Sequence, residues 1–226
     1  MSSTRPTAAA ADLTTRARIR EAAIRRFAAD GMDAPLRAIA ADASASPALI
    51  LHHFGSRAGL REACDEHVLA QIRANKASVL APGGAAVMLA QFAEIEGYSH
   101  LVGYILRGLQ SGGALAARLV DQLAAGAEDY LHEAEEAGTV SASRDPAARA
   151  RLITEQALGA LLLQLPGRGE VLDIAELPTL LRTYADRMIL PLLELYTEPL
   201  LTDSTRLDAY LSTLHLPLHN QRSPHV

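Results

Sequence analysis

Apolar residues along this chain recur mainly at the three- and four-residue spacing of amphipathic helices, and the alternation typical of strands is almost absent. The first clear stripe consists of Ile19, Ala22, Ala23 and Phe27. It predicts a helix from about Leu13, which Gly31 ends because glycine readily adopts the left-handed C-cap conformation. Residues 1–12 are small and polar and are predicted to form a disordered arm. The pattern therefore indicates an all-α protein.

Two short helices joined by a tight turn are predicted next. The first runs from Leu36 to about Ala43. Ser46 then fits an N-cap, and Pro47 fits the first helical position, where its missing N–H is no loss. The second helix is predicted from Pro47 to about Phe54. Two short helices with a tight connection have the layout of a helix-turn-helix.

The rest of the chain predicts further helices separated by glycine and proline. A long helix is expected from Ser56 to about Val79, and helical pattern then continues to Leu195. The predicted breaks are 81–84, Gly97, 111–113, 138–146 and 166–169. This organisation suggests a helix-turn-helix domain over residues 13–60, a larger helical domain over 61–200 and a tail over 201–226, whose last dozen residues are frayed.

Charge distribution adds to this division. The chain of 226 residues carries a net charge of -5, but residues up to Lys76 hold 11 basic and 8 acidic side chains, a balance of +3. The remaining residues hold 10 basic and 18 acidic side chains, a balance of -8. The asymmetry favours a nucleic-acid-binding N-terminal part, with chance as the alternative. Five arginines of the first helix are expected mostly to face solvent or phosphate: Arg16, Arg18, Arg20, Arg25 and Arg26.

Composition and known motifs exclude several other classes. Cys64 is the single cysteine, so a disulfide framework within the chain is impossible. No secretory signal and no apolar run of membrane-spanning length is found, which predicts a cytoplasmic protein without membrane contact. The chain lacks a Walker loop, G-x-S-x-G and H-E-x-x-H, so neither an enzyme nor a cofactor is predicted. His52 and His53 are adjacent and point apart on a helix, so no metal site is predicted.

Residues 14–60 resemble the DNA-binding domain of the TetR family of bacterial repressors. The strongest match is the stretch from Ser46 to Leu60, with recognition helix, His-Phe pair, small turn, basic residue and leucine. Ile19, Ala22, Ala23, Phe27, Gly31 and the Ile39-Ala40 pair also match. Over residues 61–200 the chain resembles the family only in its helical rhythm. The resemblance implies an effector-binding and dimerisation domain there.

The resemblance implies that the helix Pro47–Phe54 enters the major groove of a double-stranded DNA operator. An α-helix fits this groove, and its N-terminal residues reach base edges. Pro47 opens that helix, and the candidates for base or sugar contact on it are Ala48, Leu51 and His52. The candidates for phosphate contact are Arg37, Ser46, His53 and Arg57. Packing is an equal alternative for His53, and Leu49, Ile50 and Phe54 are expected in the core.

Four positions depart from the family pattern. Ser44 stands where the turn usually has glycine, which suggests a left-handed backbone there. Ala45 replaces a larger apolar residue, Pro35 a frequent threonine, and Leu51 the usual tyrosine of the recognition helix. These changes affect the expected affinity and operator sequence, not the fold.

The resemblance further implies an effector pocket and a dimer. The pocket is expected among the helices over 87–110 and 115–130, with core packing as the alternative for each residue. Its candidate residues are Met88, Gln91, Phe92, Tyr98, Leu101, Tyr104 and Gln110, with Ile105 as further apolar lining and His100 as a further polar anchor. Two helices, from Asp145-Pro146 to about Leu165 and from Leu177 to Leu195, are expected to form a four-helix homodimer interface with their symmetry mates. Pro191 is expected to bend the second helix or to end its ladder of hydrogen bonds.

These inferences predict a ligand-responsive transcriptional regulator, in the first instance a repressor. It would bind a palindromic operator as a dimer, and a small apolar or amphipathic effector would release it. An activator and a helical ligand-binding protein that has lost DNA affinity are the alternatives.

Overall fold

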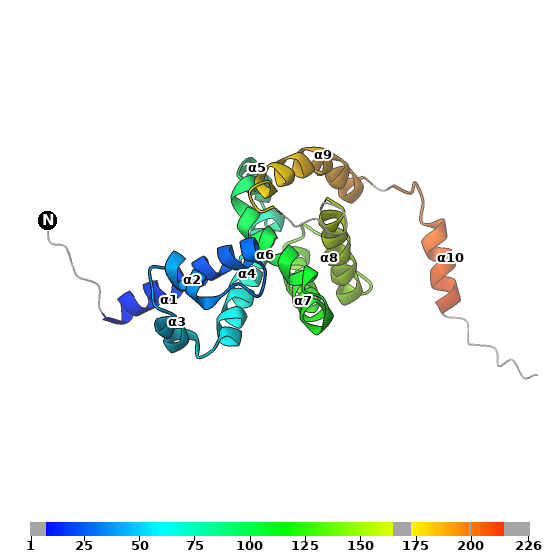
Figure 1. The fold of residues 1–226 in the computed structure, drawn as a ribbon. Helices are drawn as coiled ribbons and strands as arrows, with labels where there is room; N and C mark the ends of the chain where they lie inside the picture. The colour runs from blue at the N-terminus through cyan, green and yellow to red at the C-terminus, as the bar shows by residue number, and fades with distance from the viewer. Residues whose placement is uncertain (1–7, 165–172, 199, 215–226) are drawn as a thin grey trace, which may run out of the picture. The chain divides into compact units, whose positions relative to one another are not determined.

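The computed structural model describes residues 8–164, 173–198 and 200–214, and over these residues it is helical without strands. The first four helices are α1 (Ala8–Asp30), α2 (Leu36–Asp42), α3 (Pro47–Phe54) and α4 (Arg57–Leu80) (Figure 1). They are followed by α5 (Gly84–Ala93), the 3-10 turn η1 (Ile95–Tyr98), α6 (Ser99–Gln110), α7 (Gly113–Glu136), α8 (Pro146–Leu162), α9 (Leu177–Thr197) and α10 (Thr205–Leu214).

The observed helices agree closely with the predicted ones in the N-terminal part. α3 has the predicted bounds, and α2 and α4 end within a residue of theirs. α1 differs, because it begins at Ala8, inside the segment predicted as a disordered arm. α10 lies inside the predicted tail, while the last dozen residues and the predicted break at 166–169 lie outside the described residues.

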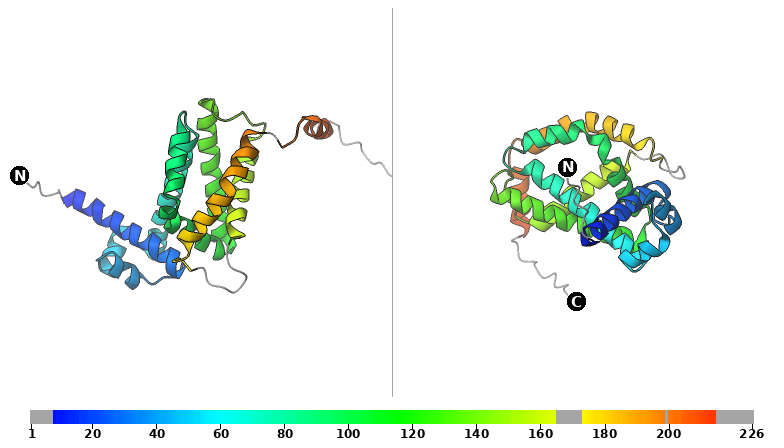
Figure 2. Two further views of the ribbon diagram at one scale, coloured as in Figure 1. Left: turned by 90° about the horizontal axis from the view of Figure 1, so that it is seen from above. Right: turned by 90° about the vertical axis from the view of Figure 1, so that its left-hand side faces the viewer.

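The hydrophobic core of the helix-turn-helix domain continues into the second part of the chain. Phe27, Ile39, Ile50 and Leu60 come from α1 to α4 and are buried in one cluster. The same cluster includes Leu101, Tyr104, Ile105 and Leu119 from α6 and α7. Figure 2 shows how α1 lies against α6, which follows it by some seventy residues. The helix-turn-helix domain therefore shares its core with α6.

Two smaller clusters hold the other helices. Leu106 on α6 packs with Leu177 and Leu181 at the start of α9. Ala127 and Leu131 on α7 pack with Ala150 on α8, and Leu80 at the end of α4 joins them. The chain forms two compact units, residues 1–185 and 186–226, and all three clusters belong to the first.

The second unit contains the end of α9 and α10. Pro191 lies inside α9, and the helix continues past it to Thr197. Large apolar side chains are exposed on α9 and α10 and include Leu190, Leu193, Tyr196, Leu207 and Tyr210. None of the described helices combines the length and apolar character that a membrane span needs.

Candidate nucleic-acid interface

Local signals in the sequence fix both ends of α3. The Ser46 side chain accepts a hydrogen bond from the backbone N–H of Leu49 at 3.1 Å, which caps the helix as predicted. Pro47 occupies the first turn, and Gly55 ends the helix with a φ of 72°. Ile50 and Phe54 are buried, so the orientation of α3 about its own axis is set by the core.

The opposite face of α3 is exposed. It presents Pro47 and the three candidates for base or sugar contact, which are Ala48, Leu51 and His52. Leu51 is 43% exposed, although it is a large apolar side chain. Arg37 on α2 is also exposed. The outward face of α3 therefore carries no carboxylate. A helix face of this shape and chemistry fits a DNA major groove.

The turn between α2 and α3 has the left-handed backbone that the sequence suggested. Ser44 has a φ of 46° and is the one non-glycine residue with positive φ among the described residues. The side chain of Arg18 donates a hydrogen bond to the Ala43 carbonyl at 2.9 Å and so ties this turn to α1. The turn that sets the angle between α2 and α3 is therefore strained at Ser44 and is held to α1 by the hydrogen bond from Arg18.

Several arginines of α1 contact the protein itself while they remain partly or largely exposed to solvent, as expected. Arg26 donates two hydrogen bonds of 2.7 Å to the Asp42 carboxylate and one of 3.0 Å to Asp30. The hydrogen bonds from Arg26 hold the pKa of Asp42 below its usual range. The guanidinium of Arg16 lies 4.9 Å from the centre of the Phe54 ring. These contacts hold α1 against α2 and α3.

Two predicted phosphate ligands also contact the protein. The His53 side chain is 4% exposed, with Nδ1 3.6 Å from Oδ1 of Asp12, and its buried Nε2 has no hydrogen-bond partner among the described residues. Arg57 donates a hydrogen bond to the Met32 carbonyl at 2.9 Å, which fixes the start of α4. Only one Arg57 nitrogen takes part in this bond, so other N–H groups of the guanidinium stay available.

The predicted effector residues are distributed over several environments. Tyr104 is fully buried and donates a hydrogen bond to Asp65, while the half-buried Gln91 donates weak ones to α4. Arg182 lies over the half-buried Phe92 ring, and Gln110 accepts a hydrogen bond from Arg107. Met88 is half-buried.

Tyr98 and Leu101 meet at a recess of about 280 Å³. Its other lining residues are Gln71, Asn75, Glu94, Gly97 and His100.

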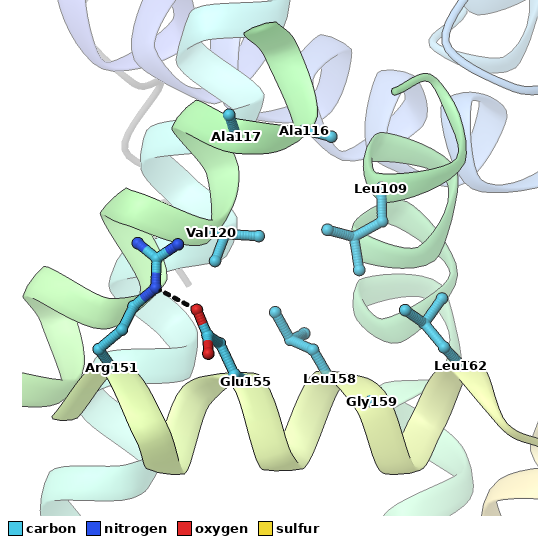
Figure 3. A pocket seen from close by; sticks show the side chains of 9 residues that line it. All are labelled: Leu109, Ala116, Ala117, Val120, Arg151, Glu155, Leu158, Gly159 and Leu162. Atoms are coloured by element: carbon cyan, nitrogen blue, oxygen red, sulfur yellow. Dashed lines mark hydrogen bonds and ion pairs between the residues drawn. The ribbon is translucent and has the colours of Figure 1, made fainter. Parts of the chain in front are cut away.

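A larger groove of about 350 Å³ lies between α6, α7 and α8 (Figure 3). Its apolar lining consists of Leu109, Ala116, Ala117, Val120, Leu158, Gly159 and Leu162. Arg151 closes one end of the groove and pairs with Glu155. Sequence reasoning missed this groove, because α8 was assigned to the dimer interface and no local pattern reveals a gap between three helices. Its volume is in the range of small-molecule sites.

Within the described parts of the chain, no three His, Cys, Asp or Glu side chains gather in a way that could hold a metal ion.

Two family models match this chain. Residues 19–64 match the model described as bacterial regulatory proteins, tetR family. Residues 96–202 match the model described as tetracyclin repressor-like, C-terminal domain. The two matches cover the helix-turn-helix domain and the helices from η1 through α9.

A curated relative matches almost the whole chain. It is the HTH-type transcriptional regulatory protein RaaS of Mycobacterium tuberculosis, 48% identical over 202 residues, which cover 89% of this chain and 94% of the relative. The matched families and this relative are transcriptional regulators, not enzymes.

Two solved structures are more distant. A TetR-family transcriptional regulator from Mesorhizobium loti has a TM-score of 0.46 and 16% identity, over 80% of this chain and 97% of its own. A TetR-family regulator from Streptomyces coelicolor has a TM-score of 0.36 and 22% identity, over 82% of this chain and 96% of its own.

Proposed function

The chain belongs to the TetR family of bacterial transcriptional regulators, and on that premise we propose that it is an effector-released repressor that binds a palindromic operator as a homodimer. The observation that carries the proposal is the exposed face of α3, capped by Ser46 and oriented by buried Ile50 and Phe54. Ala48, Leu51 and His52 contact bases or sugars. Arg37, Ser46 and the remaining donors of Arg57 contact phosphate, and His53 positions α3.

Exposed apolar faces support the homodimer. On α8, Leu152 is 56% exposed and Leu162 is also exposed. On α9, Leu190 is 73% exposed, and Leu192 and Leu193 are exposed as well. A second copy of the chain would cover these faces and place two copies of α3 on successive turns of the operator.

The shared core supports effector release. Arg107 on α6 donates hydrogen bonds to the carbonyls of Ala28 and Ala29 at the end of α1, at 3.1 and 3.0 Å. A ligand that moves α6 would therefore move the helix-turn-helix domain and change the distance between half-sites. The recess at Tyr98 and the groove in Figure 3 are the candidate effector sites in the cytoplasmic protein.

The proposal is tested by fluorescence anisotropy with duplexes from the DNA flanking the gene, at two salt concentrations. A repressor of this kind binds one duplex selectively, as one dimer per site. The affinity falls steeply with salt because each phosphate contact releases counterions. Transcription from a promoter overlapping that site then decreases when the protein is added. No selective binding by the folded protein would favour the second candidate function, a ligand-binding protein without DNA affinity.

A further inference from the structure

Leu51 is an unusual side chain for its place in the structure. Among residues 14–86, all of which the structure describes, it is the one large apolar side chain that is exposed rather than buried or half-buried. Its exposed fraction is 43%, whereas Ile50 and Phe54 on the same helix are buried. Because those two side chains fix the rotation of α3 about its axis, Leu51 is held pointing away from the core.

The outward face of α3 is mostly apolar and consists of Pro47, Ala48, Leu51 and His52. Ala48 and Leu51 are three residues apart, so they are neighbours on the helix surface. Of the four side chains, that of His52 alone can form hydrogen bonds. Hydrogen bonds from this face can therefore read only a small part of a DNA sequence, and the rest of its contact with the bases is apolar.

The major groove offers one apolar group to such a surface. Thymine carries a C5-methyl group there, whereas the hydrogen-bonding groups of adenine, guanine and cytosine are donors and acceptors. An apolar side chain packed against those groups would remove them from water without giving them a partner, which is unfavourable. A leucine on this face therefore favours thymine over the other bases.

Charges around α3 favour DNA as the occupant of this face over an apolar protein surface. α3 contains no acidic residue. Arg37, which is exposed, and Arg57, which is partly exposed, lie on the helices that precede and follow it in the chain. The residues up to Lys76 carry a balance of +3, against -8 for the rest of the chain. This combination suits a polyanion, whose phosphates the arginines can contact while the helix face reaches the bases.

We propose that Leu51 packs against the C5-methyl group of one thymine in each half-site of the operator and makes that thymine a determinant of operator choice. The inference rests on the proposed function, because it requires α3 to lie in the major groove. It goes further in naming the chemical group that α3 reads there.

The test replaces thymine with deoxyuridine, which lacks only the C5-methyl group, in the operator duplex that the full-length protein selects. One position is changed at a time, in both half-sites, and affinity is measured by fluorescence anisotropy. At the position that Leu51 contacts, the wild type is expected to bind about fourfold more weakly for each methyl group removed, the factor that corresponds to burial of one methyl group. Leu51→Ala binds the two duplexes equally, and Leu51→Met retains the preference for thymine.

Leu89→Ala is the matched control, because it removes a leucine that is 63% exposed on α5, outside the helix-turn-helix domain. It is expected to keep the wild-type preference for thymine. Equal affinity of the wild type for thymine and deoxyuridine at every position overturns the proposal. A thymine preference that Leu51→Ala retains in full overturns it as well, since another side chain would then contact the methyl group.

Binding to the unmodified duplexes separates this inference from the proposed function. If the folded wild type selects no duplex, the proposed function fails and the thymine contact fails with it. If the wild type selects an operator but no thymine methyl group affects its affinity, operator binding stands and the role of Leu51 in reading thymine is wrong.

Discussion

The hydroxyl of Tyr104 on α6 donates a hydrogen bond of 2.6 Å to Oδ1 of Asp65 on α4. The Tyr104 ring is fully buried and meets the edge of the Phe27 ring on α1, with 6.2 Å between ring centres. One side chain therefore joins α6 to the helix that begins the fold and to the helix that follows α3. It is a structural link between the helix-turn-helix domain and the rest of the chain.

Replacing Tyr104 with phenylalanine removes the hydroxyl and leaves the partly buried Asp65 carboxylate without this donor. We expect Tyr104→Phe to lower the free energy of unfolding by about 1–3 kcal/mol, the cost of a buried polar group that loses its partner. Urea unfolding of wild type, Tyr104→Phe, Asp65→Asn and the double variant isolates the pairwise contribution. Additive effects of the two single changes would show that the hydrogen bond adds nothing to stability.

The environment of Asp65 also predicts how the stability of the protein depends on pH. Desolvation raises the pKa of Asp65 in the folded protein, and the hydrogen bond from Tyr104 offsets only part of this increase. The folded state then holds the proton more tightly than the unfolded state does. The contribution of Asp65 to stability is fully present below its unfolded pKa of about 3.9 and is lost as pH rises through the higher folded value.

Urea unfolding of wild type and Asp65→Asn at several pH values above 4 measures this contribution. The difference in unfolding free energy should shift in favour of Asp65→Asn as pH rises. Asp42, whose pKa is lowered by Arg26, acts in the opposite direction and is present in both proteins, so it cancels in the comparison. A difference independent of pH would contradict the raised pKa.

The left-handed backbone of Ser44 predicts which substitutions at this position give the more stable protein. Glycine adopts a φ of 46° without a steric penalty, whereas a β-branched residue is strained there. Ser44→Val is therefore expected to be less stable than Ser44→Gly by about 1–2 kcal/mol. Thermal or urea unfolding of the two variants tests this, and equal stabilities would mean that the turn relaxes into another conformation.

The close packing at Gly59, in the first turn of α4, predicts what a single added methyl group does to stability and DNA binding. A Cβ at this position would lie 2.2 Å from the backbone oxygen of Phe54, so the end of α3 has to move. Gly59→Ala is expected to lower stability and to weaken DNA binding. In the matched control Gly126→Ala, within α7, the added methyl meets no atom, and stability should increase by about 0.5–1 kcal/mol. Wild-type behaviour of Gly59→Ala would contradict the close approach.

The sequence predicted those parts that depend on local signals. Ser46, Pro47 and Gly55 determine the ends of α3, and the positive φ of Ser44 followed from its place in the turn. Contacts between distant residues were beyond prediction: the partners of Arg26 and Arg57 lie 16 and 25 residues away. The spacing of apolar residues shows that a side chain faces inward, but not whether it meets a pocket or a core.

Tyr104 illustrates that last point, because its spacing suits both an effector pocket and the core in which it lies. α10 was missed for a different reason, since it is a short segment followed by a stretch rich in proline and histidine. The groove of Figure 3 depends on how three helices pack, which no segment of the sequence encodes alone.

The proposed function depends most on α3 as the helix that reads DNA, and one matched pair of variants tests this directly. His52→Ala removes an exposed histidine from the outward face of α3, and His132→Ala removes an exposed histidine from α7. Anisotropy titrations with the selected operator should show His52→Ala weakened by about 1–3 kcal/mol, the range of a base contact, and His132→Ala unchanged. Equal operator affinities for His52→Ala, His132→Ala and wild type would contradict the assignment of α3 as the recognition helix.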